Sequence, residues 1–129
     1  MADSPKKILI IEDDASLVEL IKKQLENEGF SIDVAIDGAE AIEKIEFSPD
    51  LILLDIMLPK VDGLTVLKNL REKSEWGAHV PVIIMSNLSP DSPTILNYVS
   101  AYEPVYYLVK AEMSLGDVKE KVKSILVPA

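Results

Sequence analysis

Short continuous apolar segments alternate along this chain with segments of helical periodicity, and this alternation constrains the fold more than any other feature. The apolar segments are far too short to span a membrane and are rich in β-branched residues, which is typical of strands buried on both faces. We predict such strands at Lys7–Ile11, Leu51–Leu54, Val80–Met85 and Val105–Val109, and a fifth strand with a weaker apolar pattern at Ser31–Ala35.

Helices are predicted in the intervals, where apolar residues recur every three or four positions and share one helix face. Gly29 is a natural stop for the first helix, and Ser114 is the expected N-cap of the last. Prolines fit only the first turn of a helix, so the fourth helix begins at about Pro93. The expected helices are Ala15–Glu28, a short one after Asp37-Gly38, Gly63–Lys73, one from about Pro93 to before Glu103, and one around Leu115–Ile125.

Five β-α units with short connections predict an α/β fold, a parallel sheet with helices on both faces. The 129 residues fit one domain, with a core over about residues 6–126, and 48% apolar residues supply that core. Trp76 and His79 fall in the expected loop before the fourth strand, where we interpret them as structural or solvent-facing.

Composition excludes several classes of function. The net charge of −9 argues against sequence-independent binding to nucleic acid or to an anionic membrane, because both need a basic surface. The absence of cysteine excludes disulfides, thiolate metal sites and cysteine nucleophiles. The first residues do not form a signal peptide, and we expect a cytoplasmic protein.

Polar residues follow four of the predicted strands at their carboxyl ends, the edge where open parallel sheets bind ligands. We therefore expect carboxylates, a hydroxyl and an ammonium to converge in one crevice. The residues concerned are Glu12-Asp13-Asp14, Asp55, Ser86-Asn87 and Lys110, of which Asp14 is expected to cap the first helix.

Carboxylates in one crevice repel each other unless a cation is present, and Mg²⁺ suits a site of few carboxylates and several waters. Zinc is disfavoured because His79, the only histidine, lies at the opposite end of the sheet. A carboxylate beside Mg²⁺, a lysine and a hydroxyl can act as a nucleophile toward phosphorus.

The order and spacing of five motifs resemble the receiver domain of bacterial two-component response regulators, the CheY-like family. This resemblance implies the flavodoxin-like (βα)5 fold with strand order 2-1-3-4-5. The motifs are Ile10–Asp14, Asp50–Pro59, Asp62-Gly63, Pro81–Ser86 and Tyr107–Lys110.

The resemblance also implies the roles of individual residues. Asp55 matches the phosphoacceptor. Asp13 and Asp55 match direct Mg²⁺ ligands together with the backbone carbonyl of Met57, and Glu12 matches a residue that acts through water.

Three further positions match the part of the family pattern that contacts the phosphoryl group or responds to it. Lys110 matches the lysine that contacts the phosphoryl group. Ser86 matches the hydroxyl switch, and Tyr107 matches the aromatic switch that turns inward when the hydroxyl moves toward the phosphate.

The chain departs from the family pattern directly after two of these positions, Lys110 and Ser86. The family usually has a proline after the lysine, with a cis peptide bond, whereas this chain has Ala111. Lys110 therefore either precedes a costly cis bond or approaches along another path. Asn87 replaces a small residue after the hydroxyl switch and could crowd the entrance.

A tyrosine-rich, charge-poor segment covers residues 87–106, whose only charged residues are Asp91 and Glu103. Such surfaces are favoured at the centres of protein interfaces. In the family, the face of the fourth helix, fifth strand and fifth helix carries the signal to partners. We hypothesise that this face binds an output protein or a dimer mate through Tyr98, Tyr102 and Tyr106.

The leading hypothesis is a phosphorylation-controlled switch, not an enzyme on outside substrates, that accepts a phosphoryl group from a phosphohistidine on a kinase or transfer protein. It acts alone or belongs to a longer protein. Apolar Met57 and Leu88 stand at the positions that tune hydrolysis in the family, and by this resemblance we predict a long-lived phosphoryl group.

Three other functions were weighed. An unphosphorylated pseudo-receiver that binds proteins is the main alternative. A phosphatase or mutase needs a carboxylate where Met57 stands, and a flavin carrier would place its phosphate against the acids after the first strand.

Overall fold

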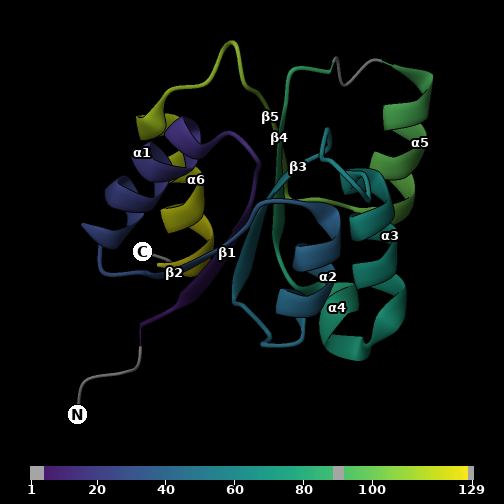
Figure 1. The fold of residues 1–129 in the computed structure, drawn as a ribbon, viewed down its shortest axis with the longest axis horizontal. Coiled ribbons are helices and arrows are strands. Elements are labelled where there is room, and N and C mark those ends of the chain that lie inside the picture. The colour runs from purple at the N-terminus through teal and green to yellow at the C-terminus, as the bar shows by residue number, and fades with distance from the viewer. Residues whose placement is uncertain (1–4, 89–91, 128–129) are drawn as a thin grey trace.

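The computed structural model of this protein describes residues 5–88 and 92–127, except for the side chains of Thr94 and Tyr98. Within these residues, parallel strands form one sheet in the order β2-β1-β3-β4-β5, as the sequence predicted (Figure 1). No helix in this part of the chain is long and apolar enough to cross a membrane. The strands are β1 (Lys7–Ile11), β2 (Ser31–Ala35), β3 (Leu51–Asp55), β4 (Val82–Ser86) and β5 (Tyr106–Val109).

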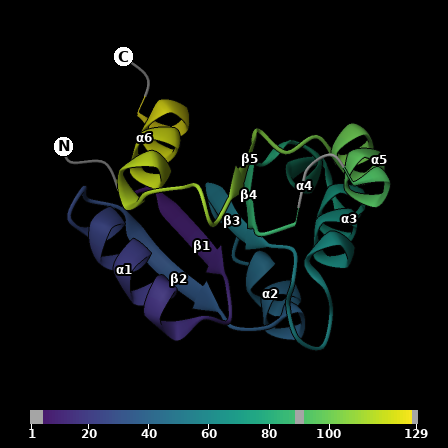
Figure 2. The same cartoon turned by 90° about the horizontal axis from the view of Figure 1, so that it is seen from above.

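The helices form two layers, one on each face of the sheet (Figure 2). Helices α2, α3, α4 and α5 lie on one side, and α1 and α6 lie on the other. Their bounds are α1 (Ala15–Glu26), α2 (Gly38–Ile45), α3 (Gly63–Lys73), α4 (Glu75–His79), α5 (Pro93–Tyr102) and α6 (Leu115–Leu126).

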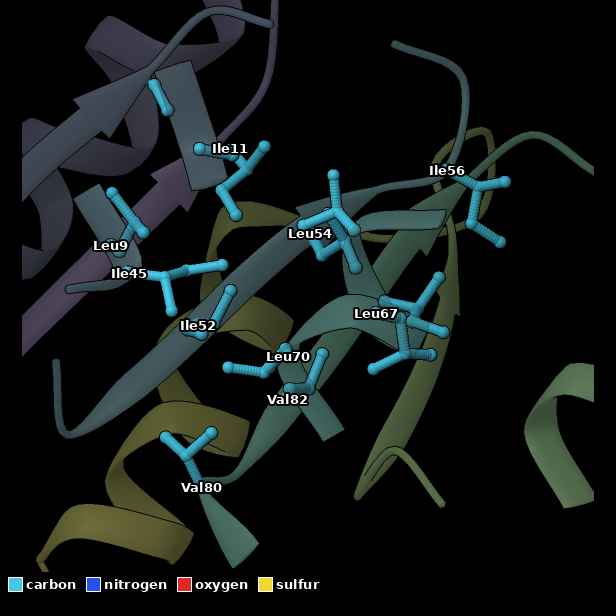
Figure 3. Close-up of a cluster of buried hydrophobic side chains, with 14 of the residues drawn as sticks. Leu9, Ile11, Ile45, Ile52, Leu54, Ile56, Leu67, Leu70, Val80 and Val82 are labelled. Carbon is cyan, nitrogen blue, oxygen red and sulfur yellow. The ribbon is translucent and has the colours of Figure 1, made fainter. Parts of the chain in front are cut away.

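Successive strand residues point to opposite faces, so each layer of helices packs against its own set of buried side chains. Leu9, Ile52 and Val82 belong to the cluster beneath α2 and α3 (Figure 3). Ile8 and Leu53 belong to the cluster beneath α1 and α6. Both faces of the central strands are therefore buried, which explains their continuous apolar sequence.

Most of the helices begin with a side chain that accepts a hydrogen bond from the first turn. The capping residues are Asp14 at α1, Asp37 at α2, Asp62 at α3, Ser74 at α4 and Ser114 at α6, which confirms the caps predicted at Asp14 and Ser114. Helix α5 differs, because Ser92 precedes it without a side-chain capping bond and Pro93 occupies its first turn.

The short helix α4 was not predicted, since the sequence analysis placed Trp76 and His79 in a loop. Ser74 accepts a hydrogen bond from the Gly77 N–H at 2.9 Å and so starts the helix. A Cβ atom at Gly77 would lie 2.1 Å from the Leu70 carbonyl oxygen. Glycine therefore permits α4 to pack directly on α3.

One edge of the sheet lies at β2, where side chains bind the backbone of Val34. The Val34 N–H donates to Asp33 Oδ1 at 2.8 Å, and Lys44 Nζ donates to the Val34 carbonyl at 2.5 Å. Lys44 Nζ and Asp33 Oδ1 are themselves 3.0 Å apart. This edge cap, formed by Asp33 and Lys44, uses backbone groups that an edge strand otherwise exposes.

Candidate functional site

The carboxyl ends of four strands bring together the polar residues that the sequence placed there. Asp55 is the last residue of β3, and Ser86 is the last residue of β4. Glu12 directly follows β1, and Lys110 directly follows β5. Because the strands are parallel, all four residues lie at the same end of the sheet, as predicted.

Lys110 lies between two buried carboxylates. Its Nζ is 2.5 Å from Glu12 Oε1 and 2.9 Å from Asp55 Oδ2. Glu12 is 0% exposed and Asp55 is 3% exposed, whereas 18% of the Lys110 side chain is exposed. One ammonium therefore compensates two carboxylates that the fold has removed from water.

The pKa values of Glu12 and Lys110 are both raised, which favours the neutral form of the carboxyl group and the charged form of the amine. Burial raises the pKa of Glu12 above its ordinary value, although Lys110 offsets part of the rise. Burial works against the charged form of Lys110, but hydrogen bonds to Glu12 and Asp55 outweigh it and raise the pKa of this ammonium.

In each of the two buried carboxylates, one oxygen accepts a hydrogen bond from the backbone and the other contacts Lys110. Glu12 Oε2 accepts a hydrogen bond from the Asp14 N–H at 3.1 Å, and Asp55 Oδ1 accepts one from the Met57 N–H at 3.1 Å. The other oxygen of each group contacts Lys110. Backbone donors therefore fix the orientation of both side chains.

Glu12, Asp13 and Asp55 form the acidic cluster of this site. One carboxylate oxygen from each lies within 4.8 Å of the others, and Asp13 is exposed. These hard oxygen donors, two buried and one open to water, fit Mg²⁺, which keeps several of its waters. The use of the Met57 carbonyl as a further ligand stays a prediction.

Ser86 and Tyr107 both hydrogen-bond to the backbone of Leu88. The Leu88 N–H donates to Ser86 Oγ at 3.1 Å, and the Tyr107 hydroxyl donates to the Leu88 carbonyl at 2.8 Å. Ser86 is fully buried and Tyr107 is half-buried, and burial raises the pKa of Tyr107. The two predicted switch residues therefore fix one loop residue between them.

Asn87 and Ala111, the two residues that depart from the family pattern, are joined by a hydrogen bond. No peptide bond among the described residues is cis, so the Lys110–Ala111 bond is trans. The Ala111 N–H donates to Asn87 Oδ1 at 3.0 Å, next to the bond from the Lys110 N–H to the Ser86 carbonyl at 2.8 Å. Asn87 therefore restrains the lysine loop, a role that sequence reasoning missed.

Gly63 supports the other side of the site. A Cβ atom there would lie 2.2 Å from the Asp55 carbonyl oxygen and 2.5 Å from Ile56 Cα. The Gly63 N–H also donates to the Ile56 carbonyl at 2.7 Å. The sequence signal was the Asp62-Gly63 pair, whose aspartate caps α3 while the glycine lets the chain pass closely behind Asp55.

The predicted interface tyrosines are partly used inside the molecule. Tyr102 is half-buried, packs against the core and donates to Glu72 Oε2 at 3.2 Å. Tyr106 is also half-buried, and Lys121 Nζ lies 4.7 Å from the centre of its ring. The side chain of Tyr98 lies outside the described residues, so the interface stays a prediction.

Comparison with known proteins decides the family. A model of the response regulator receiver domain matches residues 8–123. The chain belongs to this family. The receiver domain is 36% identical over 122 residues to the alkaline phosphatase synthesis transcriptional regulatory protein PhoP of Bacillus subtilis, a match that covers 94% of this chain and 48% of that protein. It thus spans about half the length, or less, of the first curated relatives it matches.

Solved structures agree with this assignment. The receiver domain is similar to a two-component response regulator from Clostridium difficile, with 37% identity, a TM-score of 0.81 and coverage of 95% and 97% of the two chains. It is also similar to a CheY-like receiver domain protein from Methanospirillum hungatei JF-1, with 27% identity, a TM-score of 0.83 and coverage of 94% and 93%.

Proposed function

We propose that Asp55 accepts a phosphoryl group from a phosphohistidine of a histidine kinase or phosphotransfer protein. The observation that supports this most strongly is the position of Lys110, paired with Asp55 and Glu12 beside the exposed carboxylate of Asp13. In the transfer, an Asp55 oxygen forms the new P–O bond while the P–N bond of the donor breaks and the histidine nitrogen keeps the electron pair.

The residues around Asp55 supply charge and hydrogen bonds to the transferring group. The Lys110 ammonium, which contacts Asp55, can also donate to a phosphoryl oxygen on it, and the Ser86 hydroxyl can act as a second donor. Mg²⁺ bound by Asp13, Asp55 and the Met57 carbonyl, with Glu12 acting through water, would supply further positive charge to the phosphoryl oxygens.

The change at Asp55 reaches the signalling face through Leu88. If Ser86 moves toward the phosphoryl group, the bond from the Leu88 N–H to its hydroxyl lengthens, and Tyr107 loses a fixed partner. Leu88 lies in the connection between β4 and α5, so this step shifts the equilibrium between two arrangements of the face formed by α5, β5 and α6.

We further propose that this face contacts an output protein or a second copy of the domain. Leu96 and Val105 expose apolar side chains there, at 48% and 47%. The relative PhoP is named a transcriptional regulatory protein, so control of transcription is one output that this domain could serve. Catalysis on outside substrates is not expected, because exposed Met57 carries no acid or base at the second position after Asp55.

Intact mass measurement tests the proposal directly. The protein is incubated with acetyl phosphate and Mg²⁺, and one added phosphoryl group is expected. Asp55→Asn and EDTA should both abolish the addition. Asp50→Asn is the matched control, because Asp50 directly precedes β3 at the opposite end of the sheet, where it accepts the Lys7 N–H.

The result also separates this proposal from the pseudo-receiver. Failure of the phosphoryl addition with both acetyl phosphate and a phosphorylated transfer protein would contradict the proposal and favour an unphosphorylated binding module. Addition that survives Asp55→Asn would contradict the assignment of Asp55 as the acceptor.

A further inference from the structure

One guanidinium group contacts the carboxyl end of α5. Arg71 lies on α3 and donates from Nε to the Tyr102 carbonyl at 2.8 Å and from Nη2 to the Glu103 carbonyl at 3.3 Å. Its Nη1 donates to the carbonyls of Gly77 at 3.0 Å and Val80 at 2.6 Å. We call this set of four hydrogen bonds the Arg71 clamp.

The Arg71 clamp joins segments that are distant in sequence. Tyr102 is the last residue of α5, and Glu103, with a φ of 42°, ends that helix in the left-handed region. Gly77 belongs to α4, and Val80 follows it. The clamp therefore binds the carboxyl end of α5 to the pair formed by α3 and α4, which already pack closely at Gly77.

The charge and burial of Arg71 make these contacts strong. Burial lowers the pKa of Arg71, yet arginine stays protonated in proteins, so a desolvated cation faces four carbonyl oxygens. Hydrogen bonds to charged groups contribute more than neutral ones, and a helix carboxyl end carries partial negative charge. The Glu72 carboxylate adds a contact at the same end through the Tyr102 hydroxyl.

Helix α5 is held at its amino end by Ile95, whose side chain is buried in the core. Among the described residues, no charged side chain binds the backbone at that end of α5. This is the helix whose cap makes no side-chain hydrogen bond, and Pro93 in its first turn lacks an N–H. The nearby residue Leu88 is attached through Ser86 and Tyr107, the two residues expected to respond to phosphorylation. The two ends of α5 are therefore restrained in different ways.

We propose that Arg71 is a positioning residue that fixes the carboxyl end of α5, so that phosphorylation moves the amino end about this point. The proposal rests on the phosphorylation of Asp55 proposed above. It adds that the amino end of α5, and not the carboxyl end, is the part that moves. It makes Arg71, more than 20 residues along the chain from α5, a determinant of the direction of the response.

Hydrogen exchange tests the clamp without any phosphorylation. In Arg71→Gln, the amides of the last turn of α5 should exchange roughly tenfold faster or more, because loss of charged hydrogen bonds changes a local opening equilibrium by at least that factor. Arg71→Lys should behave similarly, since a lysine cannot reach four carbonyls in a planar fork. Lys68→Gln, an exposed cation on α3, is the control and should leave exchange unchanged.

Strands β1 and β3 should keep their exchange rates in the Arg71 variants, which separates a local effect from general unfolding. Unchanged exchange at the last turn of α5 in both Arg71 variants would overturn the clamp. Faster exchange throughout the chain in Arg71→Gln and also in Arg71→Lys would show a general structural role and would likewise overturn it.

Distance measurements test the direction of movement. The chain has no cysteine, so pairs of spin labels can be introduced at Lys23 on α1 and at either Leu96 or Ala101 on α5, all of them exposed. After acetyl phosphate treatment, confirmed by intact mass, the distance to Leu96 should shift while the distance to Ala101 stays constant. In the Arg71→Gln background both distances should shift.

Each outcome of this measurement is informative. Two results would overturn the proposal that the amino end of α5 moves about a fixed carboxyl end. One is equal shifts at Leu96 and Ala101 in the presence of Arg71, and the other is no shift at Leu96 in protein shown to be phosphorylated. Absence of the added mass would instead contradict the phosphorylation itself, and the hydrogen-exchange experiment would still decide whether the Arg71 clamp exists.

Discussion

Lys110→Met should destabilise the protein strongly when Mg²⁺ is absent. In the wild type, one ammonium lies within 2.9 Å of both Glu12 and Asp55, whose side chains are almost completely buried. Methionine keeps the apolar stem and removes the charge. Two buried carboxylates would then face each other without a cation, and the pKa of Glu12, already raised by burial, would rise further.

The size of the effect follows from the burial of the pair. Removing one partner of a buried ion pair costs about 3–5 kcal/mol. Because 18% of the Lys110 side chain is exposed and water screens part of the charge, we expect the lower end, about 3 kcal/mol. For a domain of this size, such a loss corresponds to a decrease in Tm of about 10 °C.

Urea unfolding in EDTA, followed by the fluorescence of the single tryptophan, Trp76, measures this loss. Adding Glu12→Gln to Lys110→Met should restore about half of the lost stability, since one of the two uncompensated charges disappears. Lys119→Met is the matched control. Its ammonium lies 3.6 Å from Glu28 Oε1 and its side chain is 33% exposed, so loss of the charge should cost less than about 1 kcal/mol.

Added Mg²⁺ should stabilise Lys110→Met more than it stabilises the wild type, because the cation replaces the missing positive charge. A loss below about 1 kcal/mol in Lys110→Met, equal to that of the surface control, would refute the reasoning from burial. So would a double variant that is less stable than Lys110→Met alone.

Three further predictions concern the neighbours of Asp55. Met57→Asn should shorten the lifetime of the phosphoryl group, because a polar side chain can orient the attacking water; an unchanged rate of mass loss after donor removal would contradict this. Asn87→Ala should slow phosphorylation several-fold, because the Ala111 N–H loses its acceptor and the loop that carries Lys110 loses a restraint. The initial rate of mass gain measures this, and an unchanged rate would show that the loop at Lys110 does not depend on Asn87. Gly63→Ala should lower the free energy of unfolding by about 3 kcal/mol in urea, because its Cβ meets the backbone of Asp55; a loss near zero would mean that the loop shifts freely.

Much of this architecture follows from local sequence. Continuous apolar runs identified β1, β3, β4 and β5, and a weaker pattern identified β2. The residue after each run identified Asp55, Ser86 and Lys110 as neighbours. This works because a parallel sheet collects the carboxyl ends of all its strands at one edge, whatever the details of packing.

Other features depend on contacts that no local pattern records. Helix α4 is too short to show periodicity, and its start depends on Ser74 and on the glycine that fits against Leu70. The sequence does not distinguish Arg71 from Lys68 and Lys73, the other cations of the same helix. Only the folded chain shows that the Arg71 guanidinium donates to four carbonyls. The bond between Asn87 and Ala111 likewise joins two loops 24 residues apart.

The edge cap at β2 has a consequence for self-association. An exposed edge strand can pair with a strand of another molecule. At β2 the edge cap of Asp33 and Lys44 occupies the Val34 N–H and carbonyl that such a strand would bind. Chemical acetylation of Lys44 would remove its charge and with it the ion pairs that hold Nζ against the Val34 carbonyl. The Val34 carbonyl would then be less well protected, so self-association at this edge would depend on the charge of one side chain rather than on any contact made for signalling.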